Sequence, residues 1–313
     1  MILTRLRGGL GNQMFQYALG RVISKVHNEE LRLDTTGYAT KVQGDTPRSY
    51  RLQFFNIQGD IATPEDVLRA KYPFGIVSKV LRAFSQKILR KNYIDYHPEL
   101  LERKSATSGT LYLDGFFQSE KYYTVGSNDF REMIQNDFQL KPEHISPVMK
   151  IYMDQIQAMG NPASDFENSV SLHVRRGDYV TNPSANKTQG LCSIQYYTDA
   201  IAHIKQHISN PHFFVFSDDI EWVKKNIPIN SPSSQNEGGV LSPVTYISNP
   251  ELQDYEELAL MSLCKHNIIA NSSFSWWGAW LNSNPDKIVI APKQWTVSGT
   301  DHPNIIPEKW LKL

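Results

Sequence analysis

Cysteine is scarce in this sequence, which holds only Cys192 and Cys264 in 313 residues. Two cysteines are too few for a disulfide scaffold or a structural zinc site, so a reducing compartment fits the chain best. Long apolar runs are also missing, because none reaches the ~18 residues that a membrane span requires. The N-terminal segment lacks the apolar stretch of a signal peptide, and we therefore expect the protein to remain in the cytoplasm.

An excess of charge of either sign is absent as well, because Lys plus Arg and Asp plus Glu each number 32. Such a chain has no general attraction for a nucleic-acid backbone, so nucleic acid is not an expected partner. At residues 76–91 the apolar and the basic side chains fall on opposite faces of a predicted helix. We favour a helix packed on its own lobe, and the alternative is peripheral contact with the inner face of the membrane.

The second half of the chain alternates short apolar segments with helical patterns, which predicts a parallel sheet covered by helices. The first half opens in the same way, with a strand, a glycine-rich turn and a helix. The polar, turn-prone segment 162–169 separates the two halves. We therefore expect an α/β protein of two lobes, residues 1–165 and residues 166–313, each built on a Rossmann-type parallel sheet.

Ligands of parallel α/β sheets gather at the carboxyl ends of the strands, so polar residues at those ends are the site candidates. The first group is GGLGNQ, residues 8–13, between a predicted strand and its helix. Glycines such as Gly11 allow the backbone to approach a ligand, and the amides of Asn12 and Gln13 suit a neutral polyol. A tight turn with a helix cap explains this segment equally well.

The same turn matches half of a dinucleotide-binding pattern. Gly9 and Gly11 begin that pattern, and Asp34 stands where an acid would bind the ribose. Met14 occupies the position of the third glycine, so the match is weak.

Two adjacent arginines follow a buried strand in HVRRGDYV, residues 173–180. Arginine binds phosphate oxygens through two parallel hydrogen bonds, so Arg175 or Arg176 can hold a pyrophosphate and stabilise a departing nucleotide. Alternation at the strand end predicts that one of the two points into the site. Asp178 either pairs with the other arginine or accepts a proton, and we favour pairing because a salt-bridged carboxylate is a weak base. His173, taken alone, is better explained as a core histidine.

Carboxylates follow the next strand, in FFVFSDD. Asp218 and the neighbouring Ser217 can accept hydrogen bonds from ribose hydroxyls or from a guanine base, although a helix cap would explain one of the two aspartates. The chain contains no D-x-D segment, and Ile220 follows the carboxylates, so we predict a nucleoside contact and no metal site.

The segment NSSFSWWGAWL places hydroxyl groups before an aromatic helix. Asn271, Ser272 and Ser273 lie where free N–H groups of a helix start can bind phosphate without a cation. Phe274, at the mouth of the helix, is a further candidate for donor contact. The three tryptophans of this helix are expected to pack in the core: Trp276, Trp277 and Trp280.

An arginine, a helix-start hydroxyl cluster and carboxylates on successive strand ends describe a nucleotide diphosphate held without a metal, as in two-lobed GT-B-like glycosyltransferases. The segments GGLGNQMFQYA, DGFFQSEKYY, HVRRGDYV, FSDD and NSSFSWWGAWL resemble, in this order, those of the bacterial α-1,2-fucosyltransferases. The resemblance implies that L-fucose moves from GDP-β-L-fucose, with inversion, to the 2-hydroxyl of a β-galactose-terminated oligosaccharide. An O-antigen unit is one acceptor of this kind, and no divalent metal or other cofactor is implied.

The resemblance also implies roles for individual residues. Arg175 would hold the donor phosphate, and His173 and Asp218 would lie near the guanosine. Ser272 and Ser273 would help to bind phosphate.

The acceptor side and the base are less defined. Asn12 lies near the acceptor by the same resemblance, together with Gly11 and Gln13 in the same turn. The proton of the attacking hydroxyl passes to Asp178, or it is only hydrogen-bonded, for instance by Asn12, until late in the reaction. The rival interpretations are an NAD-dependent enzyme that uses Asp34 and a carbohydrate-binding protein without catalysis, and both leave parts of the second-lobe motifs unexplained.

Overall fold

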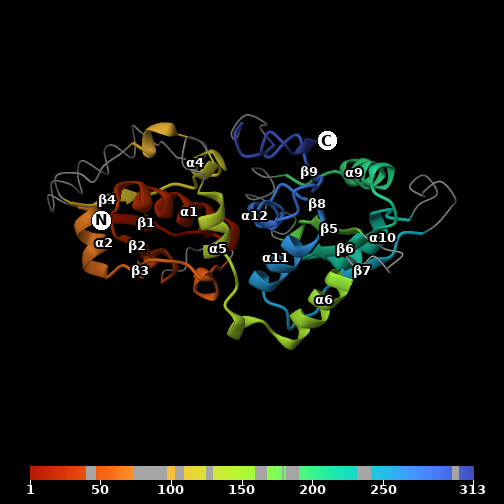
Figure 1. The fold of residues 1–313 in the computed structure, drawn as a ribbon, viewed down its shortest axis with the longest axis horizontal. Coiled ribbons are helices and arrows are strands. Elements are labelled where there is room, and N and C mark those ends of the chain that lie inside the picture. The colour runs from red at the N-terminus through yellow and green to blue at the C-terminus, as the bar shows by residue number, and fades with distance from the viewer. Residues whose placement is uncertain are drawn as a thin grey trace. The chain divides into compact units, whose positions relative to one another are not determined.

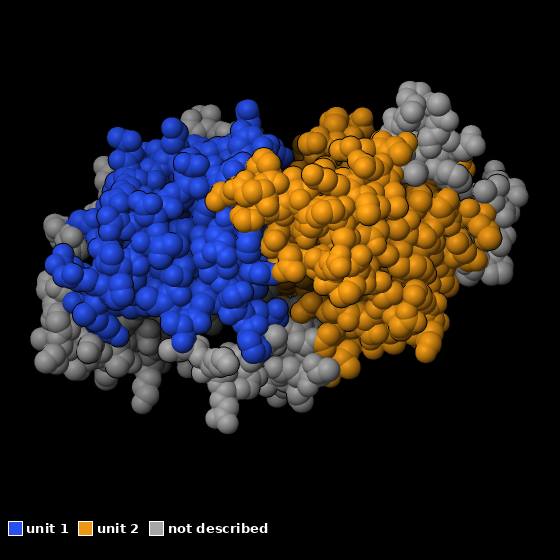
Figure 2. All heavy atoms as spheres, turned by 90° about the horizontal axis from the view of Figure 1, so that it is seen from below, with its two compact units in different colours: residues 1–139, 302–305 blue, residues 140–301, 306–313 orange. Residues whose placement is uncertain are grey.

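The chain divides into two compact units, which Figure 2 colours separately. Unit 1 holds residues 1–139 and 302–305, and unit 2 holds residues 140–301 and 306–313. The computed structural model describes residues 1–39, 47–72, 97–102, 109–124, 130–158, 168–177, 180, 190–230, 241–297 and 303–313.

The division between the units lies earlier in the chain than the predicted boundary after residue 165. Helix α6 (Pro147–Ala158) accounts for the difference. Its Met149 and Ile156 are buried in one cluster with Leu260 and Met261, which belong to unit 2. The apolar face of α6 therefore attaches this segment to unit 2, and the sequence pattern of residues 140–165 did not reveal that contact.

Unit 1 is built on a sheet of four parallel strands in the order β3-β2-β1-β4 (Figure 1). Its strands are β1 (Ile2–Arg5), β2 (Leu31–Asp34), β3 (Asp60–Ile61) and β4 (Leu111–Leu113). Its helices are α1 (Leu10–His27), α2 (Pro64–Lys71), α4 (Lys121–Thr124) and α5 (Arg131–Asp137), with short 3-10 turns at Thr36–Tyr38, Leu52–Phe54 and Pro98–Leu100.

Helix α1 packs directly on β1, and a glycine makes this close approach possible. A Cβ atom at Gly20 would stand 2.1 Å from Thr4 Oγ1, so no larger residue fits there unless the Thr4 side chain moves. The helix ends at His27, and its C-cap Asn28 takes the left-handed conformation at φ 51° and donates its N–H to the last turn.

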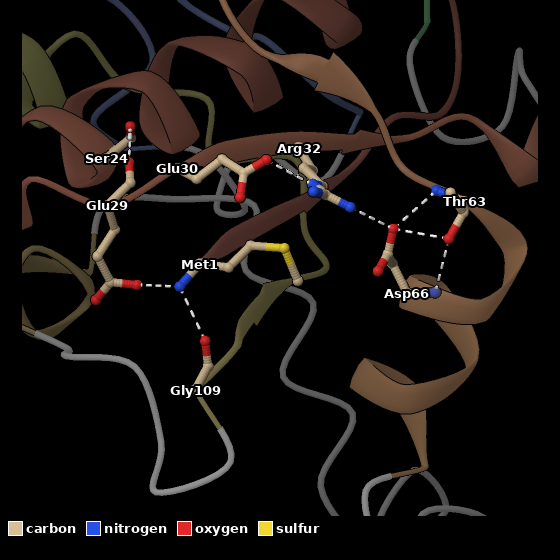
Figure 3. A network of polar contacts seen from close by, with 8 residues as sticks. All are labelled: Met1, Ser24, Glu29, Glu30, Arg32, Thr63, Asp66 and Gly109. Carbon is tan, nitrogen blue, oxygen red and sulfur yellow. Dashed lines mark hydrogen bonds and ion pairs between the residues drawn. The ribbon is translucent and has the colours of Figure 1, made fainter.

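Polar contacts tie the amino end of this sheet together (Figure 3). The α-amino group of Met1 pairs with the Glu29 carboxylate and donates to the Gly109 carbonyl at 2.8 Å. Arg32 on β2 pairs with Asp66 at 2.7 Å, and Asp66 also belongs to the capping box of α2. These contacts anchor the start of β1 and fix α2 against β2.

Unit 2 is built on six parallel strands in the order β10-β9-β8-β5-β6-β7. Its strands are β5 (Asn168–Val174), β6 (Pro211–Ser217), β7 (Val244–Ile247), β8 (His266–Ile268), β9 (Val289–Ala291) and β10 (Leu311–Lys312). Its helices are α6, α9 (Ile194–His207), α10 (Ile220–Asn226), α11 (Asp254–Leu263) and α12 (Ser273–Leu281), with a 3-10 turn at Pro142–His144.

Strand β6 shows why helices cover both faces of this sheet. Phe213 and Val215 pack into a cluster with residues of α9 and α10, whereas Phe214 and Phe216 pack into a second cluster with residues of α6 and α11. Successive side chains of a strand point to opposite faces, so a continuous apolar strand needs a cover on each side.

The strands and helices predicted for the second half of the chain are present, and the parallel sheet is confirmed. The tryptophans of α12 are fully buried, as predicted: Trp276, Trp277 and Trp280. The sequence pattern did not reveal the short helices α2 and α5 or the helix α6. No helix in the described part of the chain is both long and apolar enough to cross a membrane.

Candidate functional site

The main polar cluster of unit 2 lies at the carboxyl ends of β5 and β6. These strands pair with Val174 opposite Ser217, so the residues that follow them meet. Arg175 Nη1 lies 2.7 Å from Asp218 Oδ2, and the two side chains are 24% and 25% exposed. The other oxygen, Asp218 Oδ1, accepts the backbone N–H of Arg176 at 2.8 Å. Asp218 therefore holds the guanidinium of Arg175 at the sheet edge.

The second arginine points to helix α10. Arg176 Nε donates to Asp219 Oδ2 at 3.1 Å, and the guanidinium lies 3.7 Å from the centre of the Trp222 ring. Asp219 also caps α10 by accepting the N–H of Trp222 at 3.2 Å. One arginine therefore faces Asp218 and the other braces helix α10, so the two side chains diverge after the strand end. The donor contact of Arg176 stays a prediction.

A glycine makes room for the Asp218 carboxylate. A Cβ atom at Gly177 would stand 2.4 Å from Asp218 Oδ2, far inside van der Waals contact. Any other residue at this position would displace the carboxylate that holds Arg175. Asp178, which we expected to pair with an arginine or to accept a proton, lies outside the described residues. The predicted amphipathic helix at residues 76–91 lies outside them as well.

His173 lies near the end of β5 and is buried. Burial lowers the pKa of His173 to about 3, so its imidazole is neutral at physiological pH. The Nδ1 atom is buried and has no hydrogen-bond partner in the described part of the chain. The ring centre lies 5.7 Å from that of Phe274. A neutral ring with an unpaired nitrogen beside an aromatic side chain suits contact with a heterocyclic base.

The start of helix α12 follows β8, which is the other neighbour of β5 in the sheet. Ser272 caps the helix by accepting the N–H of Phe274 at 3.3 Å, and Ser273 is the first helical residue. Ser273 and Phe274 are half-buried. The positive end of α12 thus lies on the same sheet edge as Arg175, where both favour an anion.

Asn271 has a structural role at this edge. Its Nδ2 donates to the carbonyls of Gly190 and Trp295 at 3.3 and 3.2 Å, and its Oδ1 accepts from Cys192 Sγ at 3.4 Å. The sequence predicted a donor contact for Asn271. In the structure its amide is used to join three segments of unit 2, because a buried amide must satisfy its donors and acceptor within the protein.

Glu257, on α11, is a site candidate that no sequence motif indicated. Burial, with the nearby charges of Asp254 and Asp218, raises its pKa to about 7, and only Arg175 among its main neighbours acts in the opposite direction. Its carboxyl makes no side-chain hydrogen bond within the described residues. The sequence signal was weak because acids are common in a first helical turn, where Glu256 does serve in a capping box.

The glycine turn of unit 1 places Asn12 against the backbone. A Cβ atom at Gly8, where φ is 79°, would stand 2.8 Å from Asn12 Nδ2. Asn12 Oδ1 accepts a hydrogen bond from Gln118 Nε2 at 2.8 Å. Gln118 is buried and follows Phe117, a non-glycine residue at φ 53°. A positive φ at a non-glycine residue is strained, so the backbone that leads into Gln118 is held in this conformation by its surroundings.

Gln13 is fully buried, so it does not offer its amide to a ligand in this structure. Its Nε2 donates to the carbonyls of Gly8 and Ser49 at 3.1 and 2.8 Å, and its Oε1 accepts the N–H of Arg51 at 2.9 Å. Gly11 is buried as well. Gln13 thus has a structural role, because its amide fastens the turn to the segment at residues 49–51. The acceptor contact of Gly11 stays a prediction.

Asp34 tests the rival dinucleotide interpretation. Its side chain is 0% exposed, and its oxygens bind Lys71 Nζ at 3.0 Å, the Tyr112 hydroxyl at 2.8 Å and the Thr36 N–H at 2.9 Å. A carboxylate engaged in this way has no exposed surface for a ribose. The interpretation as a dinucleotide-binding turn therefore loses the acid on which it depended.

Ser217 and the possibility of a metal site remain from the sequence predictions. The Ser217 hydroxyl accepts the N–H of Asp219 at 3.0 Å, so it supports the turn after β6. In the portion that the structure describes, no group of three or more His, Cys, Asp or Glu residues is placed to hold a metal ion.

Two Rossmann-type units with an arginine and a helix start at one sheet edge define a glycosyltransferase of the GT-B-like class. The chain belongs to glycosyl transferase family 11, whose model matches residues 1–311. It is 34% identical to an alpha-1,2-colitosyltransferase of Escherichia coli, over 100% of this chain and 99% of the relative. It is 32% identical to the O-antigen biosynthesis glycosyltransferase WbnK of the same organism, over 98% and 99% of the two chains. Human galactoside alpha-(1,2)-fucosyltransferase 1 is 27% identical over 58% of this chain and 45% of its own length.

Solved structures show the same fold at low sequence identity. Fucosyltransferase NodZ from Bradyrhizobium has a TM-score of 0.51 at 14% identity, over 88% of this chain and 91% of NodZ. A variant of Arabidopsis thaliana FUT1 in complex with GDP has a TM-score of 0.52 at 10% identity, over 93% of this chain and 70% of that chain. The predicted α/β fold of GT-B type is confirmed.

Proposed function

We propose that this glycosyltransferase is an inverting α-1,2-fucosyltransferase that moves L-fucose from GDP-β-L-fucose to the 2-hydroxyl of a terminal β-galactoside without a metal ion. The names of its relatives support the linkage, because both the colitosyltransferase and the human fucosyltransferase form α-1,2 bonds. The relative WbnK supports an O-antigen oligosaccharide as the acceptor.

The observation that carries the proposal is the Arg175–Asp218 pair at the sheet edge that also holds the start of α12. During transfer the bond from fucose C1 to the donor phosphate breaks, and negative charge develops on the departing GDP. Arg175 and the helix N–H groups would take up that charge, and their positions are fixed before the reaction begins. The new bond joins fucose C1 to the acceptor oxygen, from the opposite face of the sugar.

Recognition of the base would fall to residues around this pair. Asp218 is occupied by Arg175 and by a backbone N–H, so Glu257 is the better candidate to accept hydrogen bonds from the N1–H and the amino group of guanine. His173 and Phe274 would contact the same ring system. We thus assign Asp218 to positioning Arg175, and this assignment replaces the predicted nucleoside contact.

On the acceptor side, Asn12 would offer its Nδ2 group, because its Oδ1 already accepts from Gln118. An N–H group donates to a sugar oxygen but does not accept the proton of the attacking hydroxyl. Asn12 would therefore orient the acceptor, and the proton would leave by another route, for which Asp178 remains our candidate.

The decisive experiment measures release of GDP from GDP-fucose with lactose or Galβ1-3GalNAc as acceptor, in the presence of EDTA. The linkage of the product is read by NMR. We expect acceptor-dependent release and an α-1,2 bond. Release only after a divalent cation is added would contradict metal independence, and silence with every galactoside would contradict the donor or the acceptor.

Transfer of colitose is a second candidate, favoured by the 34% identity to the colitosyltransferase. Colitose is L-fucose without the 3-hydroxyl group, so the two donors differ by one hydrogen-bonding group. A site that binds this hydroxyl rejects the sugar that lacks it, whereas a site without such a contact accepts both. Comparing kcat/KM for GDP-fucose and GDP-colitose decides between the two candidates.

A further inference from the structure

Arg7, at the carboxyl edge of the unit 1 sheet, carries a guanidinium with few partners. Its side chain is 32% exposed, and its Nη2 atom lies 3.8 Å from Asp114 Oδ1. Within the described residues the guanidinium makes no hydrogen bond, and the buried Nε is unpaired. A largely desolvated cation without hydrogen bonds is unfavourable unless a further partner completes it.

The neighbouring carboxylate is already bound to a different arginine. Arg5 Nη1 donates to Asp114 Oδ2 at 3.1 Å and to Asp114 Oδ1 at 3.3 Å. Asp34, at the end of the adjacent strand β2, is likewise paired with another cation, Lys71, at 3.0 Å. Asp114 must therefore serve two arginines, and Arg7 has the longer contact. Burial, which outweighs the attraction of Asp114, lowers the pKa of Arg7, as expected for an incompletely balanced cation.

The orientation of Arg7 is nevertheless fixed. Its guanidinium lies 4.4 Å from the centre of the Phe116 ring, so one face of the planar group is stacked. Its backbone N–H donates to Oε1 of the buried Gln16 at 2.9 Å. Arg7 also directly precedes Gly8, against which Asn12 lies. A fixed, partly exposed cation thus borders the turn that we assign to the acceptor.

We propose that Arg7, stacked on Phe116, forms a subsite of unit 1 for an oxyanion, a carboxylate or a phosphate, carried by the acceptor. A guanidinium binds such groups through two parallel hydrogen bonds, which neutral hydroxyls match less well. That the anion belongs to the acceptor rests on the proposed function. The subsite itself rests on the contacts of Arg7.

Three acceptors that end in the same β-galactose test the proposal: lactose is neutral, lactobionate carries a carboxylate and lactose 1-phosphate carries a phosphate. KM is measured for each at constant ionic strength with saturating GDP-fucose. We expect a KM about tenfold lower for at least one charged acceptor than for lactose, the gain of about one charge-assisted pair. The acceptor with the lower KM identifies the anion. Equal KM values for all three would overturn the proposal.

Variants separate the subsite from general charge effects. Arg7→Ala should reduce the KM ratio of lactose to the charged acceptor to about one, and Arg7→Lys should keep part of the ratio because the charge remains. The control is Arg69→Ala, which removes the same charge from the surface of unit 1. The Arg69 side chain is 77% exposed and pairs with Glu65 on the same helix. A ratio that survives in Arg7→Ala, or that falls equally in the Arg69 control, counts against the subsite.

Direct binding keeps this test separate from the proposed reaction. Calorimetric titration of the full chain with lactobionate, lactose 1-phosphate and lactose needs no donor and no turnover. Tighter binding of a charged sugar that is lost in Arg7→Ala would support the subsite even if GDP-fucose were not the donor. Equal binding of all three sugars would overturn it, whatever the transfer assay shows.

Discussion

Replacing Arg175 with alanine removes the cation that we assign to the leaving GDP. Loss of one preorganised donor of this kind costs about 2.7–4 kcal/mol of transition-state stabilisation, or roughly 10²–10³ in kcat. The structure places the effect toward the upper end. Asp218, 25% exposed, would lose its 2.7 Å partner and, among the described residues, keep the backbone N–H of Arg176 as its hydrogen-bond donor. A carboxylate without its counter-charge would then remain beside the departing anion.

The double variant Arg175→Ala/Asp218→Asn makes this reasoning specific. Asparagine keeps the size of the Asp218 side chain but removes its negative charge. If Asp218 serves to hold Arg175, the double variant should be more active than Arg175→Ala alone, because the stranded carboxylate is gone. Losses that simply add would indicate that the two residues act independently.

The assay is GDP release with saturating lactose, followed over a range of GDP-fucose concentrations. Charge stabilisation that grows in the transition state lowers kcat more than it raises KM. Arg176→Ala is the matched control, since it removes the same charge from the next residue, which braces α10. An Arg175→Ala enzyme within tenfold of the parent, or an equal loss in the control, would refute the assignment.

Four further predictions concern the surroundings of these groups. The pKa of Glu257 is raised from 4.5 to about 7, so its contribution to stability is full below pH 4.5 and is lost as the pH rises through 7. The Tm, measured from pH 4 to 8, should therefore fall less in Glu257→Gln than in the parent protein. If Glu257 binds guanine as a carboxylate, GDP affinity of the parent should rise over the same pH range, and a flat profile would contradict this. Gln118→Met should lower kcat about tenfold by releasing Asn12, with the KM for GDP-fucose unchanged, and a change in that KM would point to a wider structural effect. Gly177→Ala should displace Asp218 and reduce kcat more than Tm, which kinetics and thermal melting together would show.

Much of the fold could be predicted from local pattern alone. The apolar strand at Phe213–Phe216 required a cover on both faces, and the aromatic row of α12 required burial. Both follow from the side-chain periods of strands and helices, which neighbouring residues define. Helix α6 escaped because its partner, α11, lies about a hundred residues away, as the contact of Ser146 with Glu256 across 110 positions illustrates.

By itself, the sequence determined the two α/β halves, the family motifs and the strand ends at which polar residues gather. Only the tertiary structure decided which side chains are available there: Arg175 faces Asp218 while Arg176 braces a helix, and Gln13 is buried while Asn12 is held by Gln118. It also brought out Arg7 and Glu257, which no motif marked. The physical reason is that exposure and charge balance arise from partners far apart in the chain. Arg176 and Asp218 are 42 positions apart, and Asn12 and Gln118 are 106 positions apart. Local sequence carries no record of such pairs.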